Sequence, residues 1–411
     1  MTRVGLGGVA FAIGLMISGC GSSDSGGDQG SGASGGSGAS GGSGATGGSG
    51  ASGGNGGSGG SVELPPEEER CGSKLFETPE DPAARGPWPV GAKTLDVGGV
   101  TTEVWYPAEI GSERGQETLV YDIRKWLPDA EQGKIPDADN PWQPCDCYRD
   151  LPLDTARGPY PVIVFIHGTA AFRTQSLSQM IHWASRGFVV LSQDHKGLYL
   201  GDLLQFNFGA DLPGDTSALL SALDAGASGL DFLGDRIDMS RIGMAGHSAG
   251  GGGIAAFGNT AGVKVLIPMA AGGVDPAPES TLIMGALDDG VVAFSKQSDA
   301  YDAASPKKRL VGLGNAGHLA FSDLCGLTND KGQDLVEVAQ QYDIQNANLA
   351  TMLWDGCADG QLSQENATAV VNFATAAAFE ETLLCSPTAA GALSAIQTTY
   401  SDVSEYQEQL N

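Results

Sequence analysis

Short apolar runs recur from about residue 160 onward, and segments with helical apolar spacing separate them. The run from Val162 to Ile166 contains no polar residue, which is typical of a parallel strand buried on both faces. The further apolar runs are residues 188–192, the run that begins at Ile242, 263–268, 281–287 and 308–313, and the helical segments are 176–185, 215–230 and 368–384. Strands that alternate with helices predict an α/β fold, with a doubly wound, mostly parallel sheet and helices on both faces.

Two further patterns frame this sheet. Residues 93–97 and 101–106 are β-rich runs joined by a glycine pair, which predicts a hairpin. Residues 107–157 are irregular, polar and proline-rich, and residues 198–214 form a second irregular stretch. Long loops of this kind are usually functional or stapled. We expect these loop insertions to shape a pocket above the sheet.

The N-terminal region does not have the pattern of a folded domain. Residues 1–20 have a positive start, an apolar core and the ending Ile17-Ser18-Gly19-Cys20; they predict a secretion signal, because the segment is too short and glycine-interrupted to span a bilayer. The ending resembles the bacterial lipobox, which would make Cys20 a lipidated N-terminus in the bacterial cell envelope. An ordinary cleaved signal is the alternative. Residues 21–64 predict a Gly/Ser-rich flexible tether, which leaves 65–411 as the folded domain.

The net charge and the cysteine content limit which binding partners and which cellular compartment are possible. A formal charge of −27 argues against nucleic acid or an anionic surface as a partner. Six cysteines fit an oxidising compartment; they are Cys71, Cys145, Cys147, Cys325, Cys357 and Cys385. Their pairing stays open, except that Cys145 and Cys147 are expected to pair outward rather than with each other. The spacing of the cysteines does not match that of a zinc site. The glycines of residues 312–317 match the dinucleotide-binding motif, but the amphipathic helix that should follow this motif is missing. We therefore predict no metal and no cofactor.

The segment Gly246-His247-Ser248-Ala249-Gly250 follows one of the predicted strands and leads into a helix. Gly-x-Ser-x-Gly in this context is the nucleophile-elbow signature of α/β hydrolases. The turn is so tight that a Cβ on either side of the serine would clash with the neighbouring strand or helix. We predict that Ser248 is the nucleophile of a serine hydrolase.

A serine nucleophile needs a base, and the base needs an orienting carboxylate. In the α/β-hydrolase order the acid and then the histidine follow the serine. His318 is the only histidine after Ser248 and is the predicted general base. Asp288 and Asp289 directly follow the run 281–287. We predict Asp289 as the acid, because the two valines that follow in Asp289-Gly290-Val291-Val292 fit the pattern of such an acid loop. Asp288 is the alternative, favoured by its spacing from Gly285, and Asp275 is a third candidate.

The tetrahedral intermediate of ester cleavage needs two backbone N–H donors. We expect them from Ala249, which follows the nucleophile, and from Thr169 after the strand that ends in His167-Gly168, with Ala170 as the alternative to Thr169. His167 is expected to anchor this loop by hydrogen bonds. His247 precedes the nucleophile, and we interpret it as structural.

Several stretches resemble plasma-type platelet-activating-factor acetylhydrolase. They are His167–Thr174, Ala184–Val190, Asp194–Gly197, Gly246–Gly251 and the motif Gly317-His318-x-x-Phe321-x-Asp323. The chain is also similar to predicted dienelactone-hydrolase-like and cutinase-like polyester hydrolases. These resemblances imply an α/β-hydrolase fold and metal-free cleavage of carboxylic esters.

The chain departs from these families in two places. The acetylhydrolase carries its acid on the strand just after the nucleophile helix, where this chain has Ile267-Pro268-Met269-Ala270-Ala271. The acid must therefore come one strand later, as in the cutinase-like group, which argues against phospholipid specificity more than against ester hydrolysis. Dienelactone hydrolases proper use a cysteine nucleophile, so Ser248 argues against that chemistry.

Together these features predict a monomeric serine esterase that forms an acyl-enzyme and contacts a membrane only through an N-terminal lipid. Its substrate is a small-molecule or polymer ester, and a lipase or phospholipase-type acetylhydrolase, a polyester hydrolase and a peptidase stay open as alternatives. The alternative from another class is a non-catalytic binding protein on an inherited hydrolase fold. A missing triad residue would indicate it, but candidates for all three are present.

Overall fold

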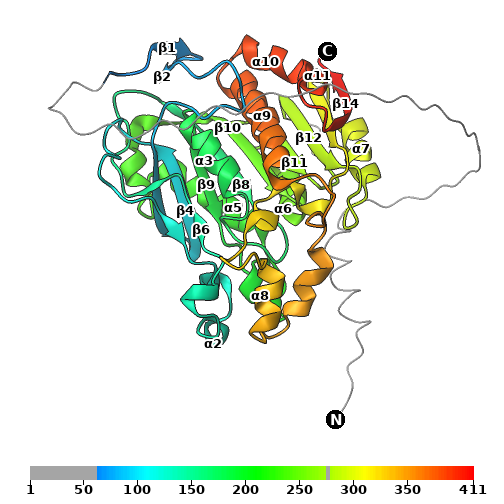
Figure 1. Ribbon diagram of the computed structural model, residues 1–411. Helices are drawn as coiled ribbons and strands as arrows, with labels where there is room; N and C mark the ends of the chain where they lie inside the picture. The colour runs from blue at the N-terminus through cyan, green and yellow to red at the C-terminus, as the bar shows by residue number, and fades with distance from the viewer. Residues whose placement is uncertain (1–62, 275–277) are drawn as a thin grey trace, which may run out of the picture. The chain divides into compact units, whose positions relative to one another are not determined.

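The computed structural model describes residues 63–274 and 278–411 (Figure 1). The folded unit is Leu64–Asn411. The predicted signal with Cys20, nearly all of the tether and the candidate acid Asp275 lie outside the described residues. In the described part of the chain, every helix is too short or too polar to cross a bilayer.

A 10-stranded sheet in the order β14-β13-β12-β11-β10-β8-β9-β4-β3-β7 forms the centre of the folded unit. Its strands are β3 (Val90–Val97), β4 (Val100–Pro107), β7 (Tyr148–Arg149), β8 (Tyr160–Ile166), β9 (Val189–Gln193), β10 (Ile237–His247), β11 (Val263–Met269), β12 (Ser280–Ala286), β13 (Lys308–Leu313) and β14 (Val403–Gln409). The six strands from β13 to β9 are parallel to one another. β4 is antiparallel to β9 and β3, and β14 is antiparallel to β13, whereas the short β7 pairs in parallel with β3. The predicted hairpin and the mostly parallel sheet are confirmed.

The remaining elements are helices, short 3₁₀ turns and two small strand pairs. The strand pairs are β1 (Glu67–Arg70) with β2 (Ser73–Phe76) and β5 (Val120–Tyr121) with β6 (Gln143–Pro144). The α-helices are α2 (Asp129–Gln132), α3 (Leu177–Ser185), α4 (Leu200–Leu204), α5 (Leu212–Ala225), α6 (Ala249–Ile254), α7 (Phe294–Ala303), α8 (Leu335–Gln341), α9 (Gln364–Leu383), α10 (Pro387–Ser394) and α11 (Ile396–Thr399). The 3₁₀ turns are η1 (Ile123–Trp126), η2 (Asp137–Asp139), η3 (Leu230–Arg236), η4 (Ala255–Phe257), η5 (His318–Phe321), η6 (Leu324–Gly326) and η7 (Ala347–Leu353).

Helices cover both faces of the sheet because the chain winds in two directions from its centre. The connection β8-α3-β9 moves toward one edge and β10-α6-β11 moves toward the other. Right-handed crossovers therefore place α3 and α6 on opposite faces. The long helix α9 packs beside α3 and crosses β10 and β11 (Figure 1). Gly243 permits this close approach, since a Cβ there would lie 2.5 Å from the ring of Phe379.

The ends of two helices differ from the predicted ones because capping side chains and a glycine decide them. The helix predicted over 368–384 begins at Gln364, where the Ser363 side chain accepts a hydrogen bond from the Asn366 N–H. The helix predicted over 215–230 is α5, which ends at Ala225. Gly226 follows it with a φ of 59°, a left-handed conformation that commonly terminates helices.

One prediction about the cysteines was wrong, and one strand was not predicted. Cys145 and Cys147 pair with each other, and 5.1 Å separates their Cα atoms. An extended chain would separate these atoms by ~7 Å, so the disulfide requires the bend between the two cysteines. The other pairs are Cys71–Cys385 and Cys325–Cys357. The edge strand β14 was not predicted, because its residues are mostly polar and only Val403 is buried.

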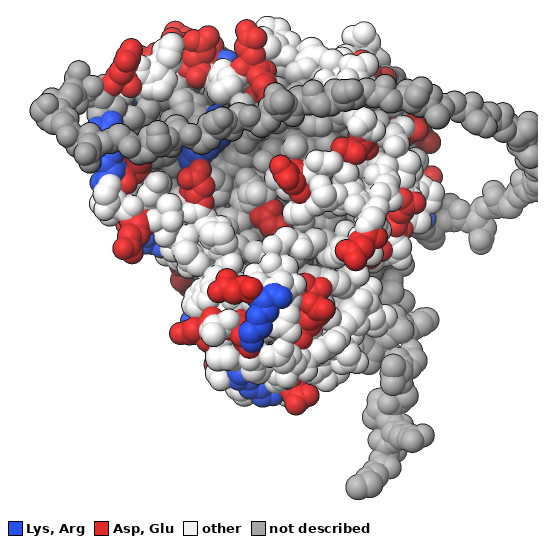
Figure 2. All heavy atoms as spheres, viewed as in Figure 1, with Lys and Arg blue, Asp and Glu red and all other residues white. Residues whose placement is uncertain are grey.

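A cap stands over the strand ends that carry the candidate active site. We define it as residues 122–141 and residues 325–357, and the Cys325–Cys357 disulfide closes the second segment. The first lies within the predicted insertion 107–157, but the pattern gave no sign of the second. Figure 2 shows acidic and basic side chains mixed over this part of the surface, where α2 and α8 lie (Figure 1). Some of these charged side chains form ion pairs or hydrogen bonds between the two segments.

Candidate active site

The predicted nucleophile elbow has the geometry that its glycines require. Ser248 lies between β10 and α6 with φ 54° and ψ −120°, a conformation that is strained for a residue with a Cβ. A Cβ on Gly246 would lie 2.5 Å from the backbone of Gly250, and a Cβ on Gly250 would lie 2.1 Å from the carbonyl oxygen of Ile166. The turn can therefore form only with glycine on both sides of Ser248.

His318 and Asp289 are hydrogen-bonded to each other. His318 begins η5 after β13, Asp289 follows β12, and 2.8 Å separates Nδ1 of His318 from Oδ2 of Asp289. The other carboxylate oxygen of Asp289 accepts hydrogen bonds from the N–H groups of Val291 and Val292, at 2.8 and 2.7 Å. Asp288 is exposed instead. Of the two adjacent candidates, Asp289 is the one in contact with the histidine.

The loop of Thr169, one of the two expected oxyanion donors, lies close to Ser248. Thr169 and Ser248 line the same pocket, and a Cβ on Gly168 would lie 3.2 Å from the Cβ of Ser248. The N–H of Ala170 donates to the carbonyl of Leu198 at 2.9 Å, so it is not free for a ligand. Ala249 is the first residue of α6, where a backbone N–H has no partner within the helix.

A chain of hydrogen bonds joins the loop after β8 to the loop that carries His318. The Gly168 N–H donates to Oε1 of Gln175 at 2.8 Å, and Nε2 of Gln175 donates to Nδ1 of His247 at 2.7 Å. Nε2 of His247 then donates to the carbonyl of His318 at 2.9 Å. Burial and the nearby His318 lower the pKa of His247 to about 3, and a neutral ring is what this donor–acceptor pattern needs. Gln175 was not singled out from the sequence.

Asp355 is a second residue that sequence reasoning missed. Its Oδ2 accepts hydrogen bonds from the N–H of His318 at 2.8 Å and from the N–H of Gly290 at 2.9 Å. Its carbonyl accepts one from the N–H of Leu319 at 2.8 Å. Asp355 therefore ties the acid loop to the histidine loop, and it comes from the disulfide-closed segment of the cap. A single aspartate in a polar segment carries no sequence signal of this role.

His167, which directly follows β8, anchors the loop after this strand. Nδ1 of His167 donates to the carbonyl of Gly168 at 2.8 Å, and its Nε2 accepts from the N–H of His195 at 3.2 Å. Burial lowers the pKa of His167 to about 4. The neutral ring holds the loop between two backbone groups.

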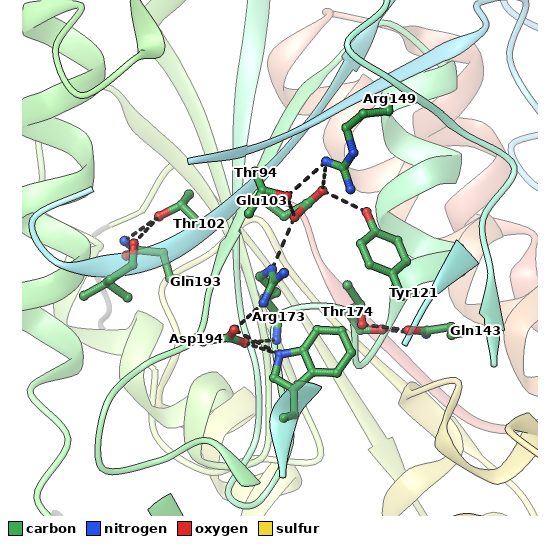
Figure 3. A network of polar contacts seen from close by, with 12 residues as sticks. Thr94, Thr102, Glu103, Tyr121, Gln143, Arg149, Arg173, Thr174, Gln193 and Asp194 are labelled. Atoms are coloured by element: carbon green, nitrogen blue, oxygen red, sulfur yellow. Dashed lines mark hydrogen bonds and ion pairs between the residues drawn. The ribbon is translucent and has the colours of Figure 1, made fainter. Parts of the chain in front are cut away.

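Behind this loop lies a network of charged side chains around one buried carboxylate, Glu103 (Figure 3). Glu103, which is fully buried, accepts hydrogen bonds from Arg149 at 2.7 Å and Tyr121 at 3.0 Å and forms an ion pair with Arg173. Arg173 also pairs with Asp194 through its guanidinium and its backbone N–H. The two arginines compensate the charge of Glu103, as a buried carboxylate requires. The network fixes the residues that directly follow the loop of Thr169.

A mostly apolar pocket opens at Ser248 and His318. It has a volume of about 100 Å³. The cap provides much of its wall, including Leu127, Ile135, Leu335, Val338, Ile344 and Leu353. Among the described residues, no group of three or more histidine, cysteine or acidic side chains is arranged to hold a metal ion.

Comparisons with known proteins agree with this architecture. A family model described as platelet-activating factor acetylhydrolase, isoform II, matches residues 142–198. Bis(hydroxyethyl) terephthalate hydrolase of Streptomyces coelicolor is 28% identical over 178 residues, which cover 41% of this chain and 54% of that protein. The chain thus spans about half the length of this relative. A solved ferulic acid esterase from Streptomyces cinnamoneus has 19% identity and a TM-score of 0.50, covering 74% of this chain and 93% of that chain.

These comparisons and the strand order identify the fold as that of the α/β hydrolases. The resemblance to α/β-hydrolase esterases expected from the sequence is confirmed. The proteins to which the chain is similar are carboxylic ester hydrolases by their descriptions.

Proposed function

We propose that this protein is a serine carboxylester hydrolase with Ser248, His318 and Asp289 as its catalytic triad. The observation that carries the proposal is the His318–Asp289 hydrogen bond beside a nucleophile elbow, with Ser248 and His318 lining one apolar pocket. The three residues come from three parallel strands whose carboxyl ends meet at one edge of the sheet, where ligands of such sheets bind.

In this mechanism His318 removes the proton from the Ser248 hydroxyl as the oxygen attacks the ester carbonyl. The N–H groups of Thr169 and Ala249 stabilise the negative charge that develops on the carbonyl oxygen. His318 then protonates the departing alcohol, which leaves an acyl group on Ser248. Water, activated by His318, releases the acid. Asp289 keeps His318 in the required tautomer and stabilises its charged form.

The substrate that we propose is a small ester of an aromatic or similarly apolar acid. The two named relatives are described as acting on terephthalate and ferulic acid esters, and the pocket beside Ser248 is lined mainly by apolar side chains. An apolar wall favours a ligand whose own surface is apolar.

The test of the function is the substitution Ser248→Ala in the full chain. Hydrolysis of p-nitrophenyl acetate should fall by at least ~10⁴-fold, and labelling by a fluorophosphonate probe should disappear. Ser217→Ala, on the exposed side of α5, is the matched control and should keep both. If Ser248→Ala retains wild-type activity, the nucleophile is another residue. A wild-type chain that neither hydrolyses esters nor reacts with the probe would instead be a binding protein on a hydrolase fold.

We also propose that Cys20 carries a lipid that anchors the protein in the bacterial cell envelope. The lipobox-like ending of the signal supports this, and the three disulfides fit an oxidising compartment. Expressed in bacteria, the wild-type chain should be recovered with membranes, and Cys20→Ala should be recovered in the soluble extracytoplasmic fraction. An identical distribution of the two chains would exclude the anchor.

A further inference from the structure

The side chain of Gln175 connects two parts of the candidate active site. Its Oε1 accepts a hydrogen bond from the Gly168 N–H at 2.8 Å, in the loop that carries Thr169. Its Nε2 donates to Nδ1 of His247 at 2.7 Å, and Nε2 of His247 donates to the carbonyl of His318 at 2.9 Å. One amide thus stands between the loop of the proposed oxyanion donor and the loop of the proposed general base.

Gln175 is itself held in place. It is fully buried, two residues before α3 begins. Its backbone N–H donates to the carbonyl of Phe172 at 2.8 Å, and its carbonyl accepts from the N–H of Asp323 at 2.9 Å. Because both its backbone and its amide are bound, the side chain can act as a rigid support for its partners.

The hydrogen bonds from Gly168 to His318 run in one direction. They begin at a backbone N–H, which can only donate, and end at a backbone carbonyl, which can only accept. Each side chain between these two groups must therefore accept at one end and donate at the other. The amide of Gln175 and the neutral ring of His247 both do so. A carboxylate at position 175 could only accept, and an apolar side chain would break both links.

Both peptide groups of Gly168 are fixed by side chains. Gln175 binds its N–H, and Nδ1 of His167 donates to its carbonyl at 2.8 Å. The peptide bond to Thr169 is trans, so the Thr169 N–H points away from the carbonyl that His167 binds. Within the residues that the structure describes, this N–H donates to no other group. It is therefore both oriented and available to a ligand.

We propose that Gln175 is a positioning residue that aligns the oxyanion donor Thr169 with the general base His318. Both groups act on the same ester, since one binds the carbonyl oxygen as it becomes negative and the other removes the proton from the nucleophile. Gln175 sets their relative position through Gly168 on one side and His247 on the other. This inference rests on the proposed esterase function and adds to it a residue that acts through others.

The loss of this alignment should affect the transition state more than the bound ester. The oxyanion donor and the base interact most strongly with the tetrahedral intermediate, whereas the ester is bound mainly by the apolar wall of the pocket. Removing the amide of Gln175 should therefore lower kcat and leave KM nearly unchanged. A general loosening of the pocket would raise KM as well.

The first test is Gln175→Met in the full chain, which removes both hydrogen bonds and keeps a side chain of similar length. We expect kcat for p-nitrophenyl acetate to fall by about 10- to 100-fold, with KM within about two-fold of the wild type. Gln193→Met is the matched control, because Gln193 is 1% exposed and its amide donates only to Thr102, at 3.1 Å. It should keep the wild-type kcat. A wild-type kcat in Gln175→Met, or the same loss in both variants, would overturn the inference.

An inhibitor that forms a tetrahedral adduct gives a second readout. The Ser248 oxygen adds to the carbonyl carbon of 1,1,1-trifluoro-4-phenylbutan-2-one, its proton passes to His318, and the ketone oxygen becomes an oxyanion. The inhibition constant of this ketone should rise at least ~10-fold in Gln175→Met, whereas that of 4-phenylbutan-2-ol, which forms no adduct, should stay within about two-fold. An unchanged constant for the ketone would overturn the inference. If Gln175→Met does not fold, Gln175→Glu replaces it; this variant keeps the acceptor for Gly168, so a several-fold increase is expected, and no increase would again overturn the inference.

Failure of this inference can be distinguished from failure of the proposed function. If ester hydrolysis depends on Ser248 but Gln175→Met retains the wild-type kcat and ketone affinity, the esterase function holds and the positioning role is overturned. If the wild-type chain hydrolyses no ester, the proposed function fails and the inference fails with it, because no oxyanion forms beside Thr169.

Discussion

At the scale of single residues, three contacts hold His318 in place. Asp289 binds its ring, Asp355 binds its backbone N–H and His247 binds its carbonyl. Only the first contact can change the chemistry of the imidazole, because it fixes which nitrogen carries the proton. The other two set where the ring lies. These roles predict different effects when each partner is removed.

Replacing the acid should distinguish the two adjacent aspartates. Asp289→Asn should lower kcat by roughly 10⁴-fold, because the amide stabilises neither the required tautomer nor the charged ring. The asparagine oxygen can still accept the N–H groups of Val291 and Val292, so the melting temperature should change little. Asp288→Asn, at the exposed neighbour, is the control with unchanged kinetics. The opposite pattern would assign the acid to Asp288.

Removing the positioning carboxylate should have a smaller effect. Asp355→Ala leaves the N–H groups of Gly290 and His318 without their acceptor, so we expect kcat to fall by about 10- to 100-fold. Asp355→Asn keeps one acceptor oxygen and should recover part of the loss. Steady-state kinetics with p-nitrophenyl acetate and the pH profile of kcat measure both variants. Equal activity in Asp355→Ala and the wild type would show that the loop needs no such support.

At the scale of elements, the cap is held together by carboxylates of its first segment. Asp139, which is 4% exposed, accepts hydrogen bonds from Tyr342 and Gln341 and pairs with Lys331 at 2.6 Å. Glu131 accepts the N–H of Gln345 at 2.8 Å. A small apolar cluster that includes Ile135, Val338 and Ile344 lies beneath these contacts. The two segments thus form one wall of the pocket although about 200 residues separate them in the chain.

Breaking this junction should affect binding more than chemistry. Asp139→Ala removes the acceptor shared by three side chains, so we expect KM for aryl esters to rise several-fold while kcat for p-nitrophenyl acetate stays within about two-fold. Limited proteolysis should cut within residues 325–357 faster than in the wild type, because local opening exposes the segment. Asp137→Ala, in the same 3₁₀ turn but with a side chain that is 82% exposed, is the control. Unchanged proteolysis and KM in Asp139→Ala would show that the disulfide and the apolar cluster suffice.

At the scale of the whole molecule, buried histidines couple stability to pH. Burial lowers the pKa of His167 to about 4 and those of His182 and His247 to about 3. The unfolded chain binds protons at these sites below pH ~6.5, whereas the native state does not. Their contribution to stability is therefore present above pH ~6.5 and is lost as the pH falls. Burial raises the pKa of Asp323 to about 6. Below this pH the native state binds one proton more at this carboxyl than the unfolded chain does, which partly offsets the effect of the histidines.

The free energy of unfolding should consequently decrease between pH 7 and pH 5. A net difference of about two protons corresponds to a slope of roughly 3 kcal/mol per pH unit at its steepest. Guanidinium unfolding at pH 7, 6 and 5 measures it, in a range where most surface carboxylates stay ionised. His182→Gln keeps an N–H donor for the carbonyl of Pro82 and should reduce the slope by about half. A stability that is flat or rises toward pH 5 would contradict the burial of neutral histidines.

The sequence alone was informative wherever a local pattern has one physical solution. The short apolar run 162–166 favours a strand buried on both faces of a sheet. Gly246 and Gly250 fit only a turn in which backbone approaches backbone. Because each parallel strand ends at the same edge, the order of Ser248, Asp289 and His318 along the chain was enough to select them as candidates.

Tertiary structure alone decided the features that join segments far apart in the chain. Asp355 and Gln175 lie in polar or irregular stretches, and their partners are residues that no spacing rule connects to them. The bend that pairs Cys145 with Cys147 and the polar edge strand β14 likewise depend on the surroundings rather than on a local pattern. Periodicity reports which side chains are buried, whereas the packing of the cap over the strand ends decides what the buried polar groups bind.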